Sequence, residues 1–200
     1  MDEATIKTYD LQASDLAALH SSLIPARIYE LVSSYFVKDG VTADIGCGIG
    51  RDTNWLNQQG FQTIGIDASG QMLREARRLY PSGQFFLDSL PALDSLKGQK
   101  FKNILCSAVI MHLKHGELLP ACQRLLELLD DNGQMLLSFR GTHFKNHIEN
   151  GKLYQPIDVP ELLDILAANG GNILIKESTP QPSRNLLWHN VVARKICPST

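Results

Sequence analysis

Residues 41–52, which read VTADIGCGIGRD, decide the fold of this 200-residue chain. A short apolar run rich in β-branched residues ends in three glycines at alternate positions, and a segment of helical character follows at once. Glycine permits backbone angles that are closed to other residues, and it has no Cβ to hold a ligand away from the main chain. The N–H groups at the start of the next helix face whatever lies above the turn. The stretch therefore predicts a strand, a tight turn and a helix that together bind a cofactor.

An acidic residue follows the glycine turn at the spacing of a nucleotide-binding unit. The apolar run 61–66 predicts a second strand, and it stops on Asp67, 21 positions after Gly46 (67 − 46). In nucleotide-binding βαβ units, a carboxylate at a spacing of about 20 reaches the ribose hydroxyls. The alternative is that Asp67 only caps the helix predicted over 71–79. The glycine turn and the carboxylate together favour the cofactor interpretation.

Predicted strands and helices alternate along the rest of the chain. The segments typical of strands are 41–45, 61–66, 84–87, 102–106, 134–139, 172–177 and 187–194, and those typical of helices are 51–59, 71–79, 117–129 and 160–168. This alternation indicates an α/β fold with a Rossmann-like, doubly wound, mostly parallel seven-stranded sheet, which the last two strands close as an antiparallel pair. The polar region 140–155 has no assignable pattern, and it is a candidate for a mobile loop over the site.

The first part of the chain predicts a helical cap. Residues 1–37 carry apolar residues at helical spacing, and Pro25 stands where a second helix can begin. We therefore divide the chain into an N-terminal helical cap, residues 1–37, and a cofactor-binding domain, residues 38–200, which forms one structural unit.

Composition and charge indicate a soluble globular protein. The apolar fraction is 44% and the charged fraction 20%, the formal net charge is −2, and the Lys and Arg residues are scattered. This pattern argues against a nucleic-acid partner. The acidic start of the chain leads into no signal-peptide core, and the apolar run 104–113 is too short to span a membrane, so we expect a cytoplasmic protein. Four widely separated cysteines predict neither a disulfide nor a metal site.

Polar residues recur where the predicted parallel strands end. Asp67 follows the second strand, Asp88 the third and Ser107 the fourth, while Gly46 follows the first. Ligands of open parallel sheets bind at the carboxyl ends of the strands. These residues are therefore expected to form a line of contacts along one crevice.

Five motifs in order resemble those of the class I S-adenosylmethionine-dependent methyltransferases, over roughly residues 35–194. Residues 44–50 resemble the family's first motif, 65–69 the second and 88–91 the third. Residues 101–113 resemble the fourth-strand motif, and 128–139 resemble the fifth. The resemblance implies S-adenosylmethionine as the cofactor.

The resemblance also implies roles for the residues of the first motif. Gly46, Gly48 and Gly50, with Cys47 between them, would let the methionine part of the cofactor lie against the backbone. Asp44 would help to hold the cofactor's ammonium group, directly or through water. The alternative for Asp44 is a buried carboxylate that holds the turn, which is compatible with the first role.

The other strand ends would contact the nucleoside and the methionine chain, on the same resemblance. Asp67, with Ala68 beside it, would accept hydrogen bonds from both ribose hydroxyls, because carboxylates are strong acceptors. Asp88 would accept from the adenine amino group, with the backbone of Ser89 and Leu90 beside it. The alternative is that Asp88 only caps its own loop.

Two further residues complete the expected cofactor contacts. Ser107 would border the methionine chain, and Tyr9 of the cap would lie over the cofactor's carboxylate end. The alternative for Tyr9 is simple helix packing. The cap and the loop 140–154 would form a lid that selects the acceptor and excludes water.

Two other functions remain as alternatives. A dehydrogenase fingerprint places glycines at the first, third and sixth positions, but the sixth position from Gly46 is Arg51, which would obstruct the packing of helix on strand. A cofactor-binding protein without transfer activity, such as a sensor or an assembly subunit, is the second alternative.

The implied reaction is direct displacement at the cofactor's methyl group, which needs alignment, exclusion of water and sometimes a general base, but no metal. Candidate bases are His112 after the fourth strand and His143 or His147 after the fifth. His112 stands in an apolar run, so a packed histidine is the simpler interpretation. Arg140 would bind an acidic acceptor, and a surface ion pair is its alternative.

The acceptor is expected to be a small molecule. The Asn- or Asp-Pro-Pro-aromatic motif, common in methyltransferases that act on amino nitrogens of DNA, is replaced here by Ser107-Ala108-Val109-Ile110. An anionic acceptor is expected if Arg140 or Arg184 faces the pocket.

Overall fold

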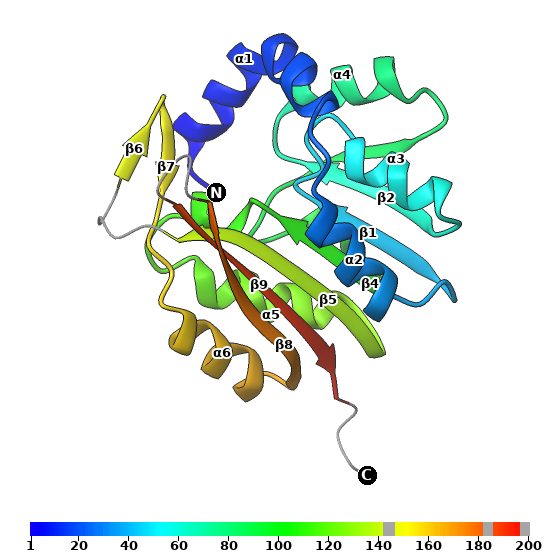
Figure 1. Ribbon diagram of the computed structural model, residues 1–200, viewed down its shortest axis with the longest axis vertical. Helices are drawn as coiled ribbons and strands as arrows, with labels where there is room; N and C mark the ends of the chain where they lie inside the picture. Colours follow the sequence, from blue (N-terminus) through cyan, green and yellow to red (C-terminus); the bar gives the residue numbers. More distant parts are fainter. Residues whose placement is uncertain (142–146, 182–185, 197–200) are drawn as a thin grey trace.

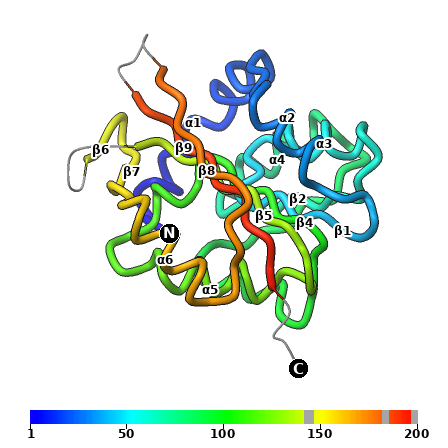
Figure 2. Tube along the Cα trace, turned by 60° about the horizontal axis from the view of Figure 1, so that its bottom comes forward, coloured from blue at the N-terminus to red at the C-terminus, as the bar shows by residue number. Residues whose placement is uncertain are grey.

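A seven-stranded sheet forms the centre of the computed structural model, which describes residues 1–141, 147–181 and 186–196 (Figure 1). The strand order is β3 (Gln84–Leu87), β2 (Gln62–Asp67), β1 (Val41–Ile45), β4 (Phe101–Ser107), β5 (Leu129–Gly141), β9 (Leu186–Lys195) and β8 (Gly171–Gln181). The strands β1 to β5 pair in parallel, and β9 runs antiparallel to both of its neighbours. Figure 2 shows β8 and β9 side by side. The predicted α/β fold is confirmed.

Helices cover both faces of the sheet. They are α1 (Glu3–Ser21), α2 (Ala26–Tyr35), α3 (Arg51–Gln58), α4 (Gly70–Leu79), α5 (Leu118–Leu128) and α6 (Val159–Ala168). On β4, Ile104 and Cys106 belong to the core beneath α5 and α6, whereas Leu105 packs with α2 and α3 on the other face. Because successive strand residues point to opposite faces, a continuous apolar run is what a strand covered on both sides requires.

The predicted strand boundaries hold within a few residues, and β5 shows where a turn signal misleads. The strand begins at Leu129, although residues 130–133 read DDNG, a sequence typical of a turn between the predicted helix 117–129 and the predicted strand 134–139. The ladder pairs Phe101 with Leu129 and next Asn103 with Gln134, so extra residues of β5 lie between two pairs. Asn132 has a φ of 60°. The turn-forming residues therefore make a bulge inside the strand.

The cap consists of two helices, as predicted, and both are joined to the domain. Pro25 is the N-cap of α2, which buries Ile28, Leu31 and Val32 against the sheet. On α1, Asp10 Oδ1 accepts hydrogen bonds from Ser69 Oγ at 2.6 Å and from the N–H of Gln71 at 3.1 Å. The boundary at residue 37 stays a prediction, because α2 shares the core of the sheet.

Within the region 140–155, residues 140–141 end β5 and residues 147–154 form a hairpin, which corrects the expectation of a loop for these residues. Strands β6 (His147–Glu149) and β7 (Lys152–Tyr154) pair antiparallel. Asn150 and Gly151 both have positive φ, of 50° and 77°, as the tight turn of a hairpin requires. The Asn-Gly pair was the available signal, but three-residue strands are too short to show alternation. His143 lies outside the described residues.

The hairpin is tied to α1 by hydrogen bonds. The N–H of Leu153 donates to Thr5 Oγ1 at 2.8 Å, and Thr8 Oγ1 donates to the carbonyl of Gly151 at 2.9 Å.

Within the described residues, no helix combines the length and the apolar character needed to cross a membrane.

Candidate active site

The glycine turn is a close-packed cradle at the carboxyl end of β1. Gly46, Gly48 and Gly50 have φ values of 75°, 56° and 78°, in the left-handed region. A Cβ on Gly46 would lie 2.1 Å from Val109 Cγ2, and one on Gly50 would lie 2.6 Å from the ring of Phe85. The outer two glycines therefore allow close packing, and Gly46 and Gly48 both line a cavity.

Asp67 is held rigidly beside this turn. Its Oδ2 accepts a hydrogen bond from the N–H of Gly48 at 2.7 Å, and its Oδ1 accepts one from the N–H of Ser69 at 2.8 Å. Burial raises the pKa of Asp67, while these N–H donors lower it in part. Each carboxylate oxygen has a second acceptor position, and Asp67 lines the cavity. The arrangement suits a ligand with neighbouring hydroxyl donors.

Asp44 lies behind the turn. Its side chain is buried, and its Oδ2 accepts a hydrogen bond from Thr53 Oγ1 at 2.6 Å. Burial raises the pKa of Asp44, and the nearby charge of Asp52 adds to this effect. Asp44 is not among the cavity-lining residues, so the observed contact matches its alternative as a structural carboxylate. A role towards the cofactor's ammonium group stays a prediction.

Asp88 is engaged within its own loop. Its carboxylate accepts hydrogen bonds from the N–H of Ser89 at 2.7 Å and from both the N–H and the hydroxyl of Ser95. Asp88, Ser89 and Leu90 are not among the residues that line the cavity, and Leu90 is buried. The hydrogen bonds match the alternative that Asp88 caps its own loop, and its contact with adenine stays a prediction.

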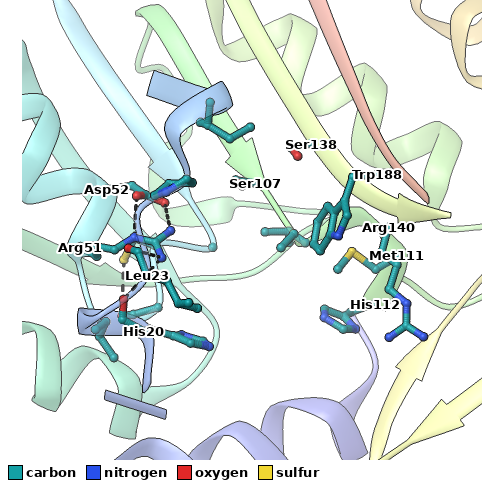
Figure 3. Close-up of a pocket in the computed structure, with 18 of the residues that line it drawn as sticks. His20, Leu23, Arg51, Asp52, Ser107, Met111, His112, Ser138, Arg140 and Trp188 are labelled. Carbon is teal, nitrogen blue, oxygen red and sulfur yellow. Dashed lines mark hydrogen bonds and ion pairs between the residues drawn. The ribbon is translucent and has the colours of Figure 1, made fainter. Parts of the chain in front are cut away.

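A cavity of about 790 Å³ opens beside the glycine turn. In Figure 3, His20, Leu23, Arg51 and Asp52 form one wall and Met111, His112, Arg140 and Trp188 face them. The predicted residues that line it are Tyr9, Gly46, Cys47, Gly48, Asp67, Ala68, Ser107, His112 and Arg140. Small-molecule sites have volumes of about 300–1,000 Å³, so the cavity is large enough for a ligand of that class.

His112 connects the cap to the hairpin. The residue is 3% exposed. Its Nδ1 lies 2.6 Å from the carbonyl of Leu153, and because a carbonyl can only accept, Nδ1 carries the proton. The hydroxyl of Tyr9 lies 3.2 Å from Nε2 and donates to it. Burial raises the pKa of Tyr9, which keeps this proton on the phenol. The contacts match the interpretation of a packed histidine, and its role as a base stays a prediction.

Titration of His112 should weaken the fold in acid. Burial lowers the pKa of His112 from 6.5 to about 4, so the unfolded chain binds more protons than the folded chain between these values. The free energy of unfolding therefore falls as the pH drops from 6.5 towards 4, by roughly 3 kcal/mol at most, and this contribution is intact above pH 6.5. When urea unfolding is measured at several pH values, the free energy of unfolding of His112→Gln should fall less steeply with decreasing pH than that of the wild type. Equal slopes would assign the acid sensitivity to other groups.

Arg140 both lines the cavity and forms an ion pair. Its Nη2 lies 2.6 Å from Glu149 Oε2, and its guanidinium carbon lies 4.4 Å from the centre of the Tyr154 ring. The ion pair matches the alternative given for Arg140, and its role towards an acidic acceptor stays a prediction. Only 12% of the side chain is exposed.

The sequence analysis missed the residues that shape the two walls. On one side, Arg51 donates to both oxygens of Asp52 at 2.8 Å, and Asp52 also accepts from the hydroxyl of Tyr29 at 2.8 Å. On the other side, Trp188 Nε1 donates to Gln181 Oε1 at 3.0 Å. Arg51 and Asp52 are neighbours in the chain, but Tyr29 and Asp52 come from different helices, and no local pattern identifies that contact.

The strand order and the glycine turn define a Rossmann-like α/β domain with its site at the carboxyl ends of the strands, next to the switch point between β1 and β4. Residues 43–133 match the family model described as a methyltransferase domain. The matched part of the chain is therefore a methyltransferase domain, in agreement with the sequence motifs, which resemble those of the class I S-adenosylmethionine-dependent methyltransferases.

Similar proteins include an uncharacterized methyltransferase of Alkaliphilus oremlandii, 30% identical over 136 residues that make up 60% of this chain and 58% of the relative. A trans-aconitate 2-methyltransferase of Rhodopseudomonas palustris is 28% identical over 167 residues, 78% of this chain and 62% of the relative. The chain thus spans about three fifths of the length of these two relatives.

Among solved structures, the fold is similar to that of the 1,6-didemethyltoxoflavin-N1-methyltransferase of Burkholderia thailandensis. The TM-score is 0.77 at 19% identity, over 97% of this chain and 88% of that one. A TehB-like methyltransferase of Corynebacterium glutamicum gives a TM-score of 0.71 at 18% identity, over 97% and 100% of the two chains.

Proposed function

We propose that the protein transfers the methyl group of S-adenosylmethionine to a small organic acceptor. The observation that carries this proposal is the single cavity that joins the glycine turn and Asp67 to the facing wall of Met111, Arg140 and Trp188. At one end, the glycine turn and Asp67 offer exposed backbone and hydrogen-bond acceptors for a nucleoside. The facing wall offers apolar side chains and the guanidinium of Arg140. A methyl donor and its acceptor have to share one cavity, because the transfer is direct.

The residues present fit the cofactor. Gly46 has no Cβ, and a Cβ at this position would overlap Val109. The absence of the side chain lets the turn pack closely while its backbone borders the cavity. Gly48 and Asp67 would hold the nucleoside and methionine parts, and Asp67 offers acceptors to the ribose hydroxyls. When bound, S-adenosylmethionine supplies a methyl group activated by the sulfonium charge. The chain's own work is to align the acceptor and to exclude water.

The cap supports the second of these tasks. Leu19, Leu23 and Ile24 line the cavity, and they come from the end of α1 and the connection to α2. Apolar side chains here lower the water content around the reacting groups. The named relatives act on trans-aconitate and on 1,6-didemethyltoxoflavin, which are small organic molecules, and they support an acceptor of this size.

Ligand-dependent melting followed by turnover tests the proposal. The protein should melt at a higher temperature with S-adenosylmethionine and with S-adenosylhomocysteine, and it should form S-adenosylhomocysteine, detected by mass spectrometry, with a member of a panel of small acceptors. A shift with NADH alone would overturn the cofactor assignment. Binding without turnover over the whole panel would favour the non-catalytic, sensor-like alternative.

A further inference from the structure

Arg140 projects from the end of β5 into the acceptor side of the cavity. It pairs across the sheet with Trp188 of β9, so the two side chains belong to one wall (Figure 3). With 12% of its side chain exposed, the guanidinium is shielded from bulk water. A charge in such a place interacts more strongly with a ligand than a charge on the surface does.

The guanidinium of Arg140 is not fully satisfied by the protein. Its Nε is buried and has no hydrogen-bond partner. Its ion pair joins Nη2 to Glu149, whose side chain is 41% exposed. A guanidinium offers five donors in a planar fork that matches both oxygens of a carboxylate. Leaving a buried donor without a partner costs about 1–3 kcal/mol, which a better-placed carboxylate would recover.

The guanidinium of Arg51, on the opposite wall of the same cavity, already has hydrogen-bond partners within the protein. Its Nε and Nη2 each donate to a different oxygen of Asp52 at 2.8 Å, and its Nη1 lies 3.4 Å from the carbonyl of Leu23. Arg27, the other arginine that lines the cavity in the described part of the chain, pairs with Glu30 and Glu177. These two cations are already neutralised.

We infer that the acceptor carries a carboxylate that Arg140 binds, and that Glu149 holds this place until the acceptor displaces it. The inference rests on the proposed function. Glu149 shows that a carboxylate fits against Nη2, and an exposed side chain can turn away into water at little cost. Among the described arginines that line the cavity, Arg140 is the one with an unpaired buried donor. One guanidinium matches a carboxylate, whereas a doubly charged phosphate would need a second cation. The rest of the acceptor would lie on Met111 and Trp188.

Opposite effects of two substitutions test this exchange. Arg140→Gln should raise KM for carboxylic acids about 30-fold, which corresponds to about 2 kcal/mol, and should leave KM for the matched carboxamides within about 3-fold. Glu149→Gln should lower KM for the same acids about 3- to 10-fold, because the competing carboxylate is gone. Glu127→Gln, which removes an exposed ion pair with Arg124, is the matched control and should change neither.

Calorimetry with S-adenosylhomocysteine present gives a readout independent of turnover. Carboxylic acids should bind more tightly to Glu149→Gln than to the wild type. In both proteins, phosphate monoesters should bind no more tightly than the carboxylic acids. If Arg140→Gln does not fold, Glu149→Gln still decides, because it keeps Arg140. An unchanged or raised KM in Glu149→Gln, or equal use of acids and amides by the wild type, would overturn the inference. If the wild type binds no S-adenosylmethionine, the proposed function itself fails.

Discussion

Replacing Asp67 with alanine should weaken binding of S-adenosylmethionine about 100-fold. The ribose would lose its hydrogen bonds to the carboxylate. The N–H groups of Gly48 and Ser69 would also lose their acceptor. Each lost charge-assisted bond or unsatisfied N–H costs about 1–3 kcal/mol, and 100-fold corresponds to about 2.7 kcal/mol. Calorimetric titration with S-adenosylhomocysteine measures the effect, and urea unfolding shows that the variant is folded.

Asp88→Ala is the companion variant for this experiment, because it distinguishes the two predictions for Asp88, a contact with adenine and a cap of its own loop. Asp88 also follows a parallel strand, and it also accepts hydrogen bonds from backbone N–H groups, those of Ser89 and Ser95. Asp88 does not line the cavity, so its loss should change the affinity less than about 3-fold. A loss for Asp88→Ala as large as that for Asp67→Ala would support the contact with adenine that the sequence motif predicts. An unchanged affinity in Asp67→Ala would refute its assignment to the cofactor.

These two aspartates also show how far the sequence can be taken. Asp67 and Asp88 both follow an apolar strand and precede a small residue, so pattern alone assigns them the same kind of role. In the structure, Asp67 reaches back to the N–H of Gly48 and so lies beside the glycine turn. Asp88 instead turns towards Ser95, seven residues ahead. What separates them is the path of the following chain, which no short motif encodes.

The sheet was predictable because its signals are local. Each buried strand is a short apolar run bounded by turn residues, and the glycine turn fixes the first strand-to-helix connection. Even the misread segment 130–133 kept its local character, since the turn-forming residues became a bulge in β5. Sequence reasoning therefore predicted the strands of the central sheet, but it missed the hairpin of β6 and β7, whose strands are only three residues long.

Most of the acceptor side of the site was not predictable, because it is built from pairs that are distant in sequence. Tyr9 and His112 meet from the cap and from the segment after β4, and Arg140 pairs with a residue of the hairpin. Their residue types suggested chemistry, but their partners depend on how α1 and the hairpin pack together. The histidine illustrates the difference, since the Leu153 carbonyl fixes its tautomer.

The glycine turn provides the second large prediction, and it tests the packing of the cradle. Gly46→Ala should lower the free energy of unfolding by about 2–5 kcal/mol, the sum of two contributions. A φ of 75° costs an alanine about 1–2 kcal/mol, and the new Cβ would lie 2.1 Å from Val109 Cγ2, an overlap that adds about 1–3 kcal/mol. Gly70→Ala is the matched control, because nothing lies within 4 Å of its Cβ position and it begins a helix. That change should be neutral or stabilise by up to about 1 kcal/mol.

A double-mutant cycle with Val109→Ala separates the two causes. Shortening Val109 removes the methyl group that the new Cβ would meet, but it leaves the backbone strain at residue 46. The overlap should therefore appear as a favourable coupling of about 1–3 kcal/mol between the two substitutions, and the strain should remain in the double variant. Urea unfolding of the four proteins measures the cycle. Additive effects would mean that Val109 does not press on the turn, and that the glycine at position 46 is required for its backbone angles alone.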